Sequence, residues 1–426
     1  MSKGAVCLSV IVFFSLSLVA QDNKDFQDTF LEAEYFFMNE EYSDAITYYL
    51  QLYEKLPDNA NLAYRIGVCY LNIQGKKDFS VEYLEKASKQ MSAKFKEGNI
   101  NQKASPYDAL YYLGKAYQIN YKFDKAKEVF NKYLGTILHD DQENLDFINH
   151  EIEICDMAKV LIDKPIKYSE ENVGKLFNDE KANFNPIISA DGNSFAYMVT
   201  LKFYDAVMFS KLVDGIWTAP ISITPELQID GDIYISSLSF DGKLLFLSKD
   251  DNYDSDIFTS SFNGSNWSQA VKLNKNINTK YWESHGFISE DGSQFIFASD
   301  RPGGYGGLDL YISLKVNGDW GPAVNLGPEI NTQFNEDRPF LINNSKTIFF
   351  SSQGHENIGG YDLFRSDLQS NSLWSNPKNL GFPINNTDDN IFFMPIDNGN
   401  AGYYSISKES GGFGKEDIYK ITLKKN

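Results

Sequence analysis

The stretch most suggestive of chemistry is the glycine-rich run "SDRPGGYGGLDLY", residues 299–311. A loop that cradles phosphate needs a helix start after its glycines, because backbone N–H groups and the helix dipole hold the anion. Here the chain continues as "LDLYISLKV", whose alternating apolar residues are typical of a strand. Glycines between two strands supply the positive φ of a hairpin. The sequence therefore favours a hairpin over a nucleotide site.

A second stretch, "DDNYDSD" at residues 250–256, has the residue types of a cation site. It places oxygen ligands at alternate positions: Asp250, Asn252, Asp254 and Asp256. Such spacing can wrap a hard cation such as calcium. A calcium loop also needs a glycine at its sixth position and a glutamate at its twelfth, where Ser255 and Ser261 stand. The pattern favours a solvated acidic hairpin, with calcium as the alternative.

Acid/base chemistry rests on few residues, because the chain has only four histidines. His285 follows Glu283 on one predicted strand, which makes an acid/base pair conceivable, although a polar contact in a channel is the favoured interpretation. The motifs G-x-S-x-G, H-E-x-x-H and C-x-x-C do not occur. The sequence predicts no enzyme and no cofactor.

The composition points to an exported, acidic protein. The 426 residues carry a net charge of −19, which repels nucleic acid and excludes it as the main partner. Residues 1–20 contain Lys3 and the apolar run "AVCLSVIVFFSLSLVA", followed by acidic "QDNKD". This is the pattern of a signal peptide cleaved after Ala20. We expect a periplasmic or outer-membrane-associated protein without a transmembrane span once the peptide is removed.

Residues 26–163 show helical periodicity that repeats at about 34 residues, the period of tetratricopeptide (TPR) repeats. Small residues such as Ala33, Gly67 and Gly114 recur where paired helices must approach closely. Residues 145–162 read as a helix that caps the stack. The unit predicted is an all-α, TPR-like stack of helical repeats.

Tyrosine is frequent in this helical region, beyond what packing requires. Tyrosine supplies large contact area at low entropy cost and is enriched at interface hot spots. We expect some of these residues to bind a partner in the groove and others only to pack. The candidates are Tyr35, Tyr48, Tyr64, Tyr111 and Tyr112.

Residues 166–426 repeat five times at about 50 residues per unit. Each unit contains a turn pair such as Asp-Gly, an Asp-apolar-aromatic step, a tryptophan and an Ile-Asn pair, although not every unit keeps all four. Four antiparallel strands per unit predict one propeller blade each. The last unit ends without its fourth strand, and residues 172–186 align with 325–339. We therefore expect strand 168–178 to close a five-bladed, all-β ring.

One landmark has a structural interpretation. The repeated Asp256, Asp309, Asp362 and Asp417 can accept hydrogen bonds from backbone N–H groups of the adjacent turn and fix the blade corner. The first unit has Ala206 at this position and departs from the pattern.

These landmarks resemble the TolB-like, WD-type β-propellers of Bacteroidetes envelope proteins. The carrying motifs are "DRPGGYGGLDLY" and W-x-x-P/A-x-x-L-G-x-x-I-N at 320–331 and 374–385, preceded by the TPR units. The nearest architecture is the PorE/OmpA family, whose C-terminal OmpA-like domain has no counterpart here, so peptidoglycan anchoring is not carried over. The resemblance implies a non-catalytic envelope scaffold for protein–protein interaction in type IX secretion, gliding or outer-membrane assembly. It implies partners such as a PorP/SprF-like outer-membrane barrel or secretion components. The alternative is a propeller that binds glycan or peptide at its channel mouth.

Overall fold

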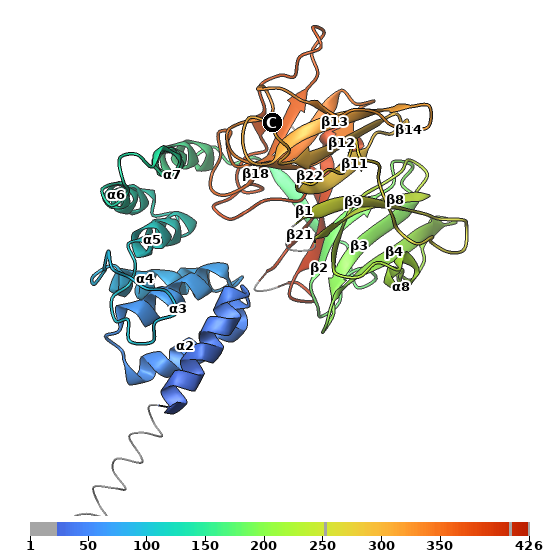
Figure 1. The fold of residues 1–426 in the computed structure, drawn as a ribbon. Helices are drawn as coiled ribbons and strands as arrows, with labels where there is room; N and C mark the ends of the chain where they lie inside the picture. The colour runs from blue at the N-terminus through green and yellow to red at the C-terminus, as the bar shows by residue number, and fades with distance from the viewer. Residues whose placement is uncertain (1–23, 251–253, 409–410, 425–426) are drawn as a thin grey trace, which may run out of the picture. The chain divides into compact units, whose positions relative to one another are not determined.

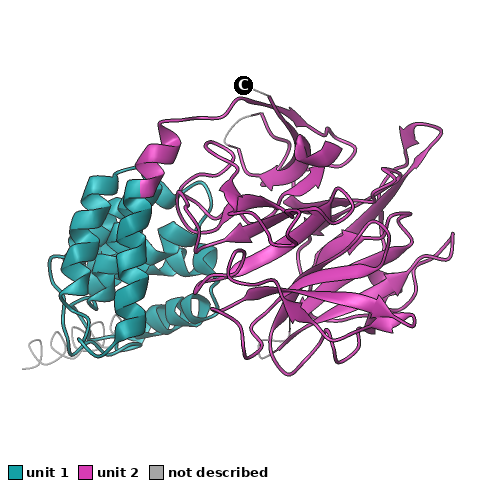
Figure 2. Cartoon of the chain, turned by 90° about the horizontal axis from the view of Figure 1, so that it is seen from above, with its two compact units in different colours: residues 1–156 teal, residues 157–426 magenta. Residues whose placement is uncertain are grey.

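The computed structural model describes residues 24–250, 254–408 and 411–424. The chain divides into two compact units, residues 1–156 and 157–426 (Figure 2). The first is helical and the second is a five-bladed β-propeller, so the predicted fold class is confirmed (Figure 1). The boundary between the units falls inside helix α7.

The helical unit packs consecutive helices against each other. Gly67 and Gly114 stand where a Cβ atom would lie only 2.5 Å from Leu84 and 2.3 Å from Phe130, so small residues permit the close approach of α3 to α4 and of α5 to α6. A helix over residues 24–38 comes first. It is followed by α2 (Tyr42–Lys55), α3 (Ala60–Asn72), η1 (Lys77–Phe79), α4 (Ser80–Ala87), α5 (Asp108–Ile119), α6 (Phe123–Leu134) and α7 (Gln142–Ile162).

Each blade of the propeller is an antiparallel sheet. Blade one contains β2 (Asn183–Ile188), β3 (Ser194–Thr200), β4 (Asp205–Val213), β5 (Ile216–Trp217) and β6 (Ile221–Ser222), and blade two contains β7 (Asp232–Leu238), β8 (Leu244–Asp250), β9 (Ser255–Ser261) and β10 (Val271–Lys272). Blade three contains β11 (Glu283–Ile288), β12 (Gln294–Ser299), β13 (Asp309–Val316), β14 (Asp319–Trp320) and β15 (Val324–Asn325). Blade four contains β16 (Glu336–Ile342), β17 (Thr347–Ser352), β18 (Asp362–Asp367) and β19 (Lys378–Asn379). Blade five contains β20 (Met394–Ile396), β21 (Ala401–Ile406), β22 (Asp417–Leu423) and β1 (Tyr168–Asn172).

The innermost strands β2, β7, β11, β16 and β20 contact one another around the ring. Four of them carry a register shift of the β-bulge kind near their first residues. Two residues in these shifts, Asn185 and Arg338, have positive φ values of 47° and 50°. Bulges and strained backbone of this kind often re-aim side chains at functional sites.

The ring is closed by the start of the propeller unit. β1 pairs antiparallel with β22 over five residues, Tyr168 opposite Leu423 through Asn172 opposite Tyr419. The paired strand is shorter than the predicted span 168–178, because the Asn172 side chain accepts a 2.8 Å hydrogen bond from the Gly174 N–H and turns the chain.

Asn178, just after this turn, completes the closure. Its side chain accepts from the Ile418 N–H at 2.8 Å and donates to the Ile418 carbonyl at 3.0 Å. The Ile-Asn landmark has the same role in three other blades, where Asn278, Asn331 and Asn385 clamp the backbone of Ile257, Leu310 and Leu363 in this way.

Candidate functional site

The glycine-rich run is the hairpin between β12 and β13, as predicted. A Cβ at Gly306 would lie 2.4 Å from the backbone of Gln333, and one at Gly307 would lie 2.1 Å from the Asn335 side chain. The glycines therefore let this hairpin rest on the first turn of the next blade, where the Gly307 N–H donates to the Phe334 carbonyl at 3.1 Å.

The repeated aspartates hold blade corners, which confirms their structural interpretation in three blades. Asp309 accepts from the N–H groups of Tyr305 (2.6 Å) and Gly306 (3.2 Å), and from the Asn325 side chain (2.8 Å). Asp417 and Asp362 make equivalent bonds to their own turns and to Asn172 and Asn379. Asp256 departs from this pattern and pairs with Lys272.

Glu283 is also part of the framework and does not face His285 as an acid/base partner. It is fully buried and accepts from the N–H (2.6 Å) and hydroxyl (2.7 Å) of Thr279, from Ser299 (2.8 Å) and from Arg301 (3.2 Å). Glu336 of the next blade accepts from Thr332 and Ser352 in the same arrangement. The repetition of this arrangement indicates that both carboxylates serve the blade, and burial raises the pKa of Glu283 and raises that of Glu336 to about 7.

His285 instead belongs to a polar group at the start of the innermost strands, which we call the channel cluster: Ser284, His285, Asp337, Arg338 and Asn185. Asp337 accepts hydrogen bonds from the Ser284 hydroxyl at 2.5 Å and from the Arg338 backbone N–H at 2.7 Å. Its second oxygen lies 3.6 Å from Nδ1 of His285. The Arg338 guanidinium donates to the Asn185 side chain on β2 at 3.3 Å, so the cluster joins three blades.

The electrostatics of the channel cluster are dominated by burial. Burial and the Arg338 charge lower the pKa of His285, so the ring is neutral at neutral pH. Burial disfavours the charged form of Asp337, but His285, Arg338 and Ser284 together lower its pKa. His285 is only 8% exposed, and neither ring nitrogen makes a hydrogen bond to any described residue. Buried polar groups are normally hydrogen-bonded, so these two ring nitrogens are an exception within the channel cluster.

The opposite end of the same strands is apolar. A cavity of about 390 Å³ lies there, lined by residues of all five blades. Phe240 at its rim is 45% exposed, whereas Phe287 is buried. The apolar lining is Ile188, Leu238, Phe240, Phe287, Leu341, Ile342, Met394 and Ile396, with Ser189, Glu290, Asn343 and Asp397 among the polar residues. We call this region the apolar mouth.

The acidic hairpin is placed only in part, since Asn252 lies outside the described residues. Asp250 accepts from the Ser255 hydroxyl at 2.5 Å, and its pKa is raised by burial and by Asp232 and Asp337. Asp250 therefore lies near the channel cluster. Within residues 24–250, 254–408 and 411–424, no three acidic, histidine or cysteine side chains are grouped to hold a metal ion. The calcium alternative stays a prediction.

The five tyrosines of the helical unit divide by burial. Tyr35 is 62% exposed, whereas Tyr64 is 8% exposed and packs its ring 5.8 Å from that of Tyr112. Tyr64 therefore belongs to the core, and Tyr35 offers contact area to a partner.

The other three are partly exposed and contact neighbouring rings. Tyr48 stacks on Phe36 with ring centroids 5.7 Å apart, and Tyr111 lies 5.2 Å from Tyr112. Burial raises the pKa of Tyr112, and the carboxylates of Asp108, Glu97 and Glu40 add to the rise. The surface around Tyr112 is thus acidic.

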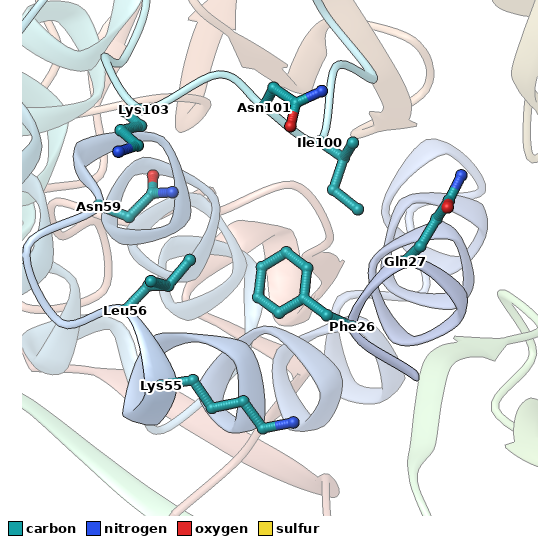
Figure 3. A pocket seen from close by; sticks show the side chains of 8 residues that line it. All are labelled: Phe26, Gln27, Lys55, Leu56, Asn59, Ile100, Asn101 and Lys103. Carbon is teal, nitrogen blue, oxygen red and sulfur yellow. The ribbon is translucent and has the colours of Figure 1, made fainter. Parts of the chain in front are cut away.

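The helical unit also holds a cavity of about 660 Å³. Figure 3 shows the Phe26 ring at its centre with Leu56 and Ile100 beside it, and Lys55 and Lys103 toward its edges. The lining combines these three apolar side chains with two lysines and the amides of Gln27, Asn59 and Asn101. No helix in the described part of the chain is long and apolar enough to cross a membrane.

Sequence reasoning favoured a channel contact for His285 and a channel mouth as an alternative binding site, but it did not find the partners of His285 or the residues that line the apolar mouth. The residues equivalent to His285 in the other blades are Asn185, Ile235, Arg338 and Phe392, which share no chemistry, so the repeat gives no sign of them. The signal that could have found the cluster is Asp337-Arg338 adjacent to each other at the start of a predicted innermost strand.

Comparison with known proteins adds structural likenesses only. No protein-family profile and no curated protein matches the sequence. Among solved structures, TolB from Acinetobacter baumannii is similar at 17% identity and a TM-score of 0.37, covering 57% of this chain and 54% of that one. The putative TolB from Agrobacterium tumefaciens is similar at 15% identity and a TM-score of 0.36, covering 58% and 78%. The catalytic domain of the GH62 α-L-arabinofuranosidase from Coprinopsis cinerea is similar at 12% identity and a TM-score of 0.38, covering 61% and 97%.

The chain spans about half the length of the A. baumannii TolB structure. These structural likenesses assign no function to this chain. The class of protein is defined by its own fold, a helical unit followed by a five-bladed propeller.

Proposed function

We propose that this protein is a non-catalytic scaffold of the cell envelope, exported by its signal peptide, that holds partner proteins on its TPR-like helical unit and its propeller face. The observation that carries the proposal is the apolar mouth, where side chains of five blades form an apolar floor with polar residues around it. An apolar centre with a polar rim is the anatomy of a protein interface. The half-exposed Phe240 ring offers a contact for an apolar side chain of the partner.

The absence of catalysis is part of the same proposal. It is supported by the use of Glu283, Glu336, Asp309, Asp362 and Asp417 as hydrogen-bonded corners of the blades. Each of these carboxylates accepts hydrogen bonds from its own blade and so serves the fold, although burial raises the pKa of Glu336 to about 7.

The biological setting that we propose is type IX secretion, gliding or outer-membrane assembly, with a PorP/SprF-like barrel or another secretion component as the partner. Its support is the sequence resemblance to Bacteroidetes envelope propellers. The net charge of −19 favours a partner surface with basic character.

Pull-down from cross-linked envelopes tests the proposal with the full-length chain as bait. Phe240→Asp places a charge in the apolar mouth and should remove the partner that the wild-type protein captures. Leu314→Asp is the matched control, because Leu314 is also half-exposed but lies on β13 away from the mouth. Equal capture by both variants would locate the interface elsewhere.

The channel cluster favours a second candidate function, the binding of a glycan or peptide. His285 brings two unbonded ring nitrogens to a site that also holds a carboxylate, a guanidinium and a hydroxyl. Such a mixture of donors and acceptors fits a polyhydroxyl ligand. Saturation-transfer NMR with chitotriose and with a tripeptide tests this function, and loss of the signal in Ser284→Ala is expected if either binds here. No saturation transfer to either probe would remove this candidate.

A further inference from the structure

Blade one contains a cavity of about 370 Å³ beside the turn that closes the ring. Its lining includes Tyr197 and Leu201 from β3 and the following turn, Met208 from β4, and Leu176, Phe177 and Asp179 from the closing segment. The cavity belongs to the blade whose corner aspartate is replaced by Ala206, and Ala206 also lines it.

In blade three the same place is filled by Arg301. Its guanidinium lies 4.9 Å from the ring centroid of Phe297 and 5.0 Å from that of Tyr311. It donates to the carbonyls of Asn276 at 3.2 Å and Ile277 at 2.5 Å. The two rings are opposite partners on β12 and β13, so the arginine is held over a cross-strand aromatic pair.

Blades four and five fill the place with other nitrogen-bearing side chains. His355 lies 5.8 Å from the Phe350 ring and 5.3 Å from the Phe364 ring, and its Nε2 bonds the Ile330 carbonyl at 2.8 Å. Lys408 places its ammonium 4.3 Å from the Tyr419 ring centroid. Three blades therefore place a nitrogen-bearing side chain against an aromatic ring here; those of Arg301 and His355 also bond a carbonyl of the preceding blade, whereas Lys408 pairs with Glu170.

The register relates blade one to blade three position by position. Tyr197 on β3 is paired with Met208 on β4, just as Phe297 on β12 is paired with Tyr311 on β13. A residue of β12 therefore corresponds to the residue of β3 that is numbered 100 lower. Smaller or apolar residues stand where blade three has its polar network: Leu201 for Arg301, Ala206 for Asp309, Ser222 for Asn325 and Asn183 for Glu283. The cavity is the space that these replacements leave.

The features that hold Arg301 in blade three have counterparts in this cavity. Leu176 and Phe177 correspond to Asn276 and Ile277, whose carbonyls accept from the guanidinium, and Tyr197 supplies an aromatic ring. Asp179 adds a carboxylate that is 45% exposed and paired with Lys181 at 2.6 Å. We propose that this cavity is a receptor for an arginine side chain presented by a partner protein.

The surroundings fit a protein as the owner of that arginine. Phe203 is 85% exposed and Tyr204 52% exposed in the short loop between β3 and β4, and Leu176 and Phe413 are also exposed. An apolar rim around a buried polar anchor is typical of an interface hot spot. The chain as a whole is acidic, with a net charge of −19, while the cavity itself holds Lys175 and Lys181 beside Asp179. A flat guanidinium can stack on Tyr197 and bond two carbonyls at once, which an ammonium cannot do.

Methionine-methyl NMR on the full-length chain tests the proposal, with N-acetyl-arginine N-methylamide as the probe. Met208 lines the cavity, whereas Met394 lines the apolar mouth and serves as an internal control. We expect the Met208 signal to shift saturably and the Met394 signal to stay. N-acetyl-citrulline N-methylamide has the same shape without the charge and should bind at least about fivefold more weakly.

Two variants sharpen the result. Leu201→Arg restores the pattern of blade three, so it should abolish probe binding and raise the melting temperature. Val271→Ser changes an exposed residue on β10, outside the lining and the rim, and should leave probe binding unchanged. Equal shifts with arginine and citrulline, or an unshifted Met208 in the wild type, would overturn the proposal whether or not the variants fold.

This site deepens the proposed scaffold function, on which the identity of the partner rests. The arginine probe tests the receptor separately from the scaffold function, because its binding needs no partner protein. If the probe binds but no partner is captured, the scaffold function is refuted and the arginine receptor stands. If Leu201→Arg still captures the partner, the partner binds another surface.

Discussion

Burial of the His355 side chain should make the stability of the propeller depend on pH. Burial lowers its pKa below the usual value, so the folded state holds the neutral ring. As pH falls below about 6.5, the unfolded chain takes up the proton first, and stability decreases by up to about 1.4 kcal/mol per pH unit. His355→Gln should reduce this acid-side loss, whereas His139→Gln, at an exposed position, should not. Urea unfolding between pH 5 and 7 measures the difference, and identical slopes for the two variants would contradict it.

Tyr35 is exposed and Tyr64 is buried, so substitutions at these two tyrosines should affect partner binding and stability differently. We expect Tyr35→Ala to weaken partner binding by about 1–2 kcal/mol with little loss of stability, because its ring is 62% exposed. Tyr64→Ala removes a buried ring and should cost about 3 kcal/mol of unfolding free energy instead. Binding and thermal unfolding of both variants, measured side by side, check this division. A stable Tyr64→Ala protein that has lost its partner would reverse it.

At the scale of the element, the closing turn depends on one amide. Asn178→Ala leaves the N–H of the fully buried Ile418 without its partner, while the Ile418 carbonyl keeps the Val173 N–H at 3.2 Å. An unsatisfied buried N–H makes the expected cost about 1–3 kcal/mol. Asn376→Ala, on an exposed loop, is the control. Guanidinium unfolding of the full-length proteins compares them, and equal midpoints would mean that the ring is not held by this clamp.

The elements were predictable because the residues that build them repeat. Asp309, Asn331 and the hairpin glycines have counterparts in other blades. A pattern that recurs at about 50 residues therefore reveals the five blades, although blade one lacks the aspartate. Sites depend on what differs between copies. Arg338 and His285 occupy equivalent positions but come together through bulges, and Ala206 marks a departure whose consequence, a cavity, needs the packing of Tyr197 and Met208 to be known.

At the scale of the molecule, charge should govern how fast a partner arrives. The net charge of −19 creates a field that steers a basic partner, and salt shortens its range from about 10 Å at 0.1 M to about 3 Å at 1 M. The association rate with the recovered partner should therefore fall at least about tenfold over this range, while the dissociation rate changes little. Stopped-flow mixing at several salt concentrations measures both. An association rate independent of salt would mean that the net charge of the chain does not steer the partner.

The pairing of β1 with β22 also means that the ring can close only when the last strand of the propeller is present. Asn172 and Asp417, which share a hydrogen bond, are 245 positions apart, so β1 must wait for nearly the entire unit to be synthesised before it finds its neighbour. Contacts of such long range form slowly. A chain interrupted before residue 417 would leave β1 and β21 each with an unpaired edge, and exposed strand edges of this kind are prone to aggregation. The seven residues of β22 thus decide whether the first strand of the propeller finds a partner at all.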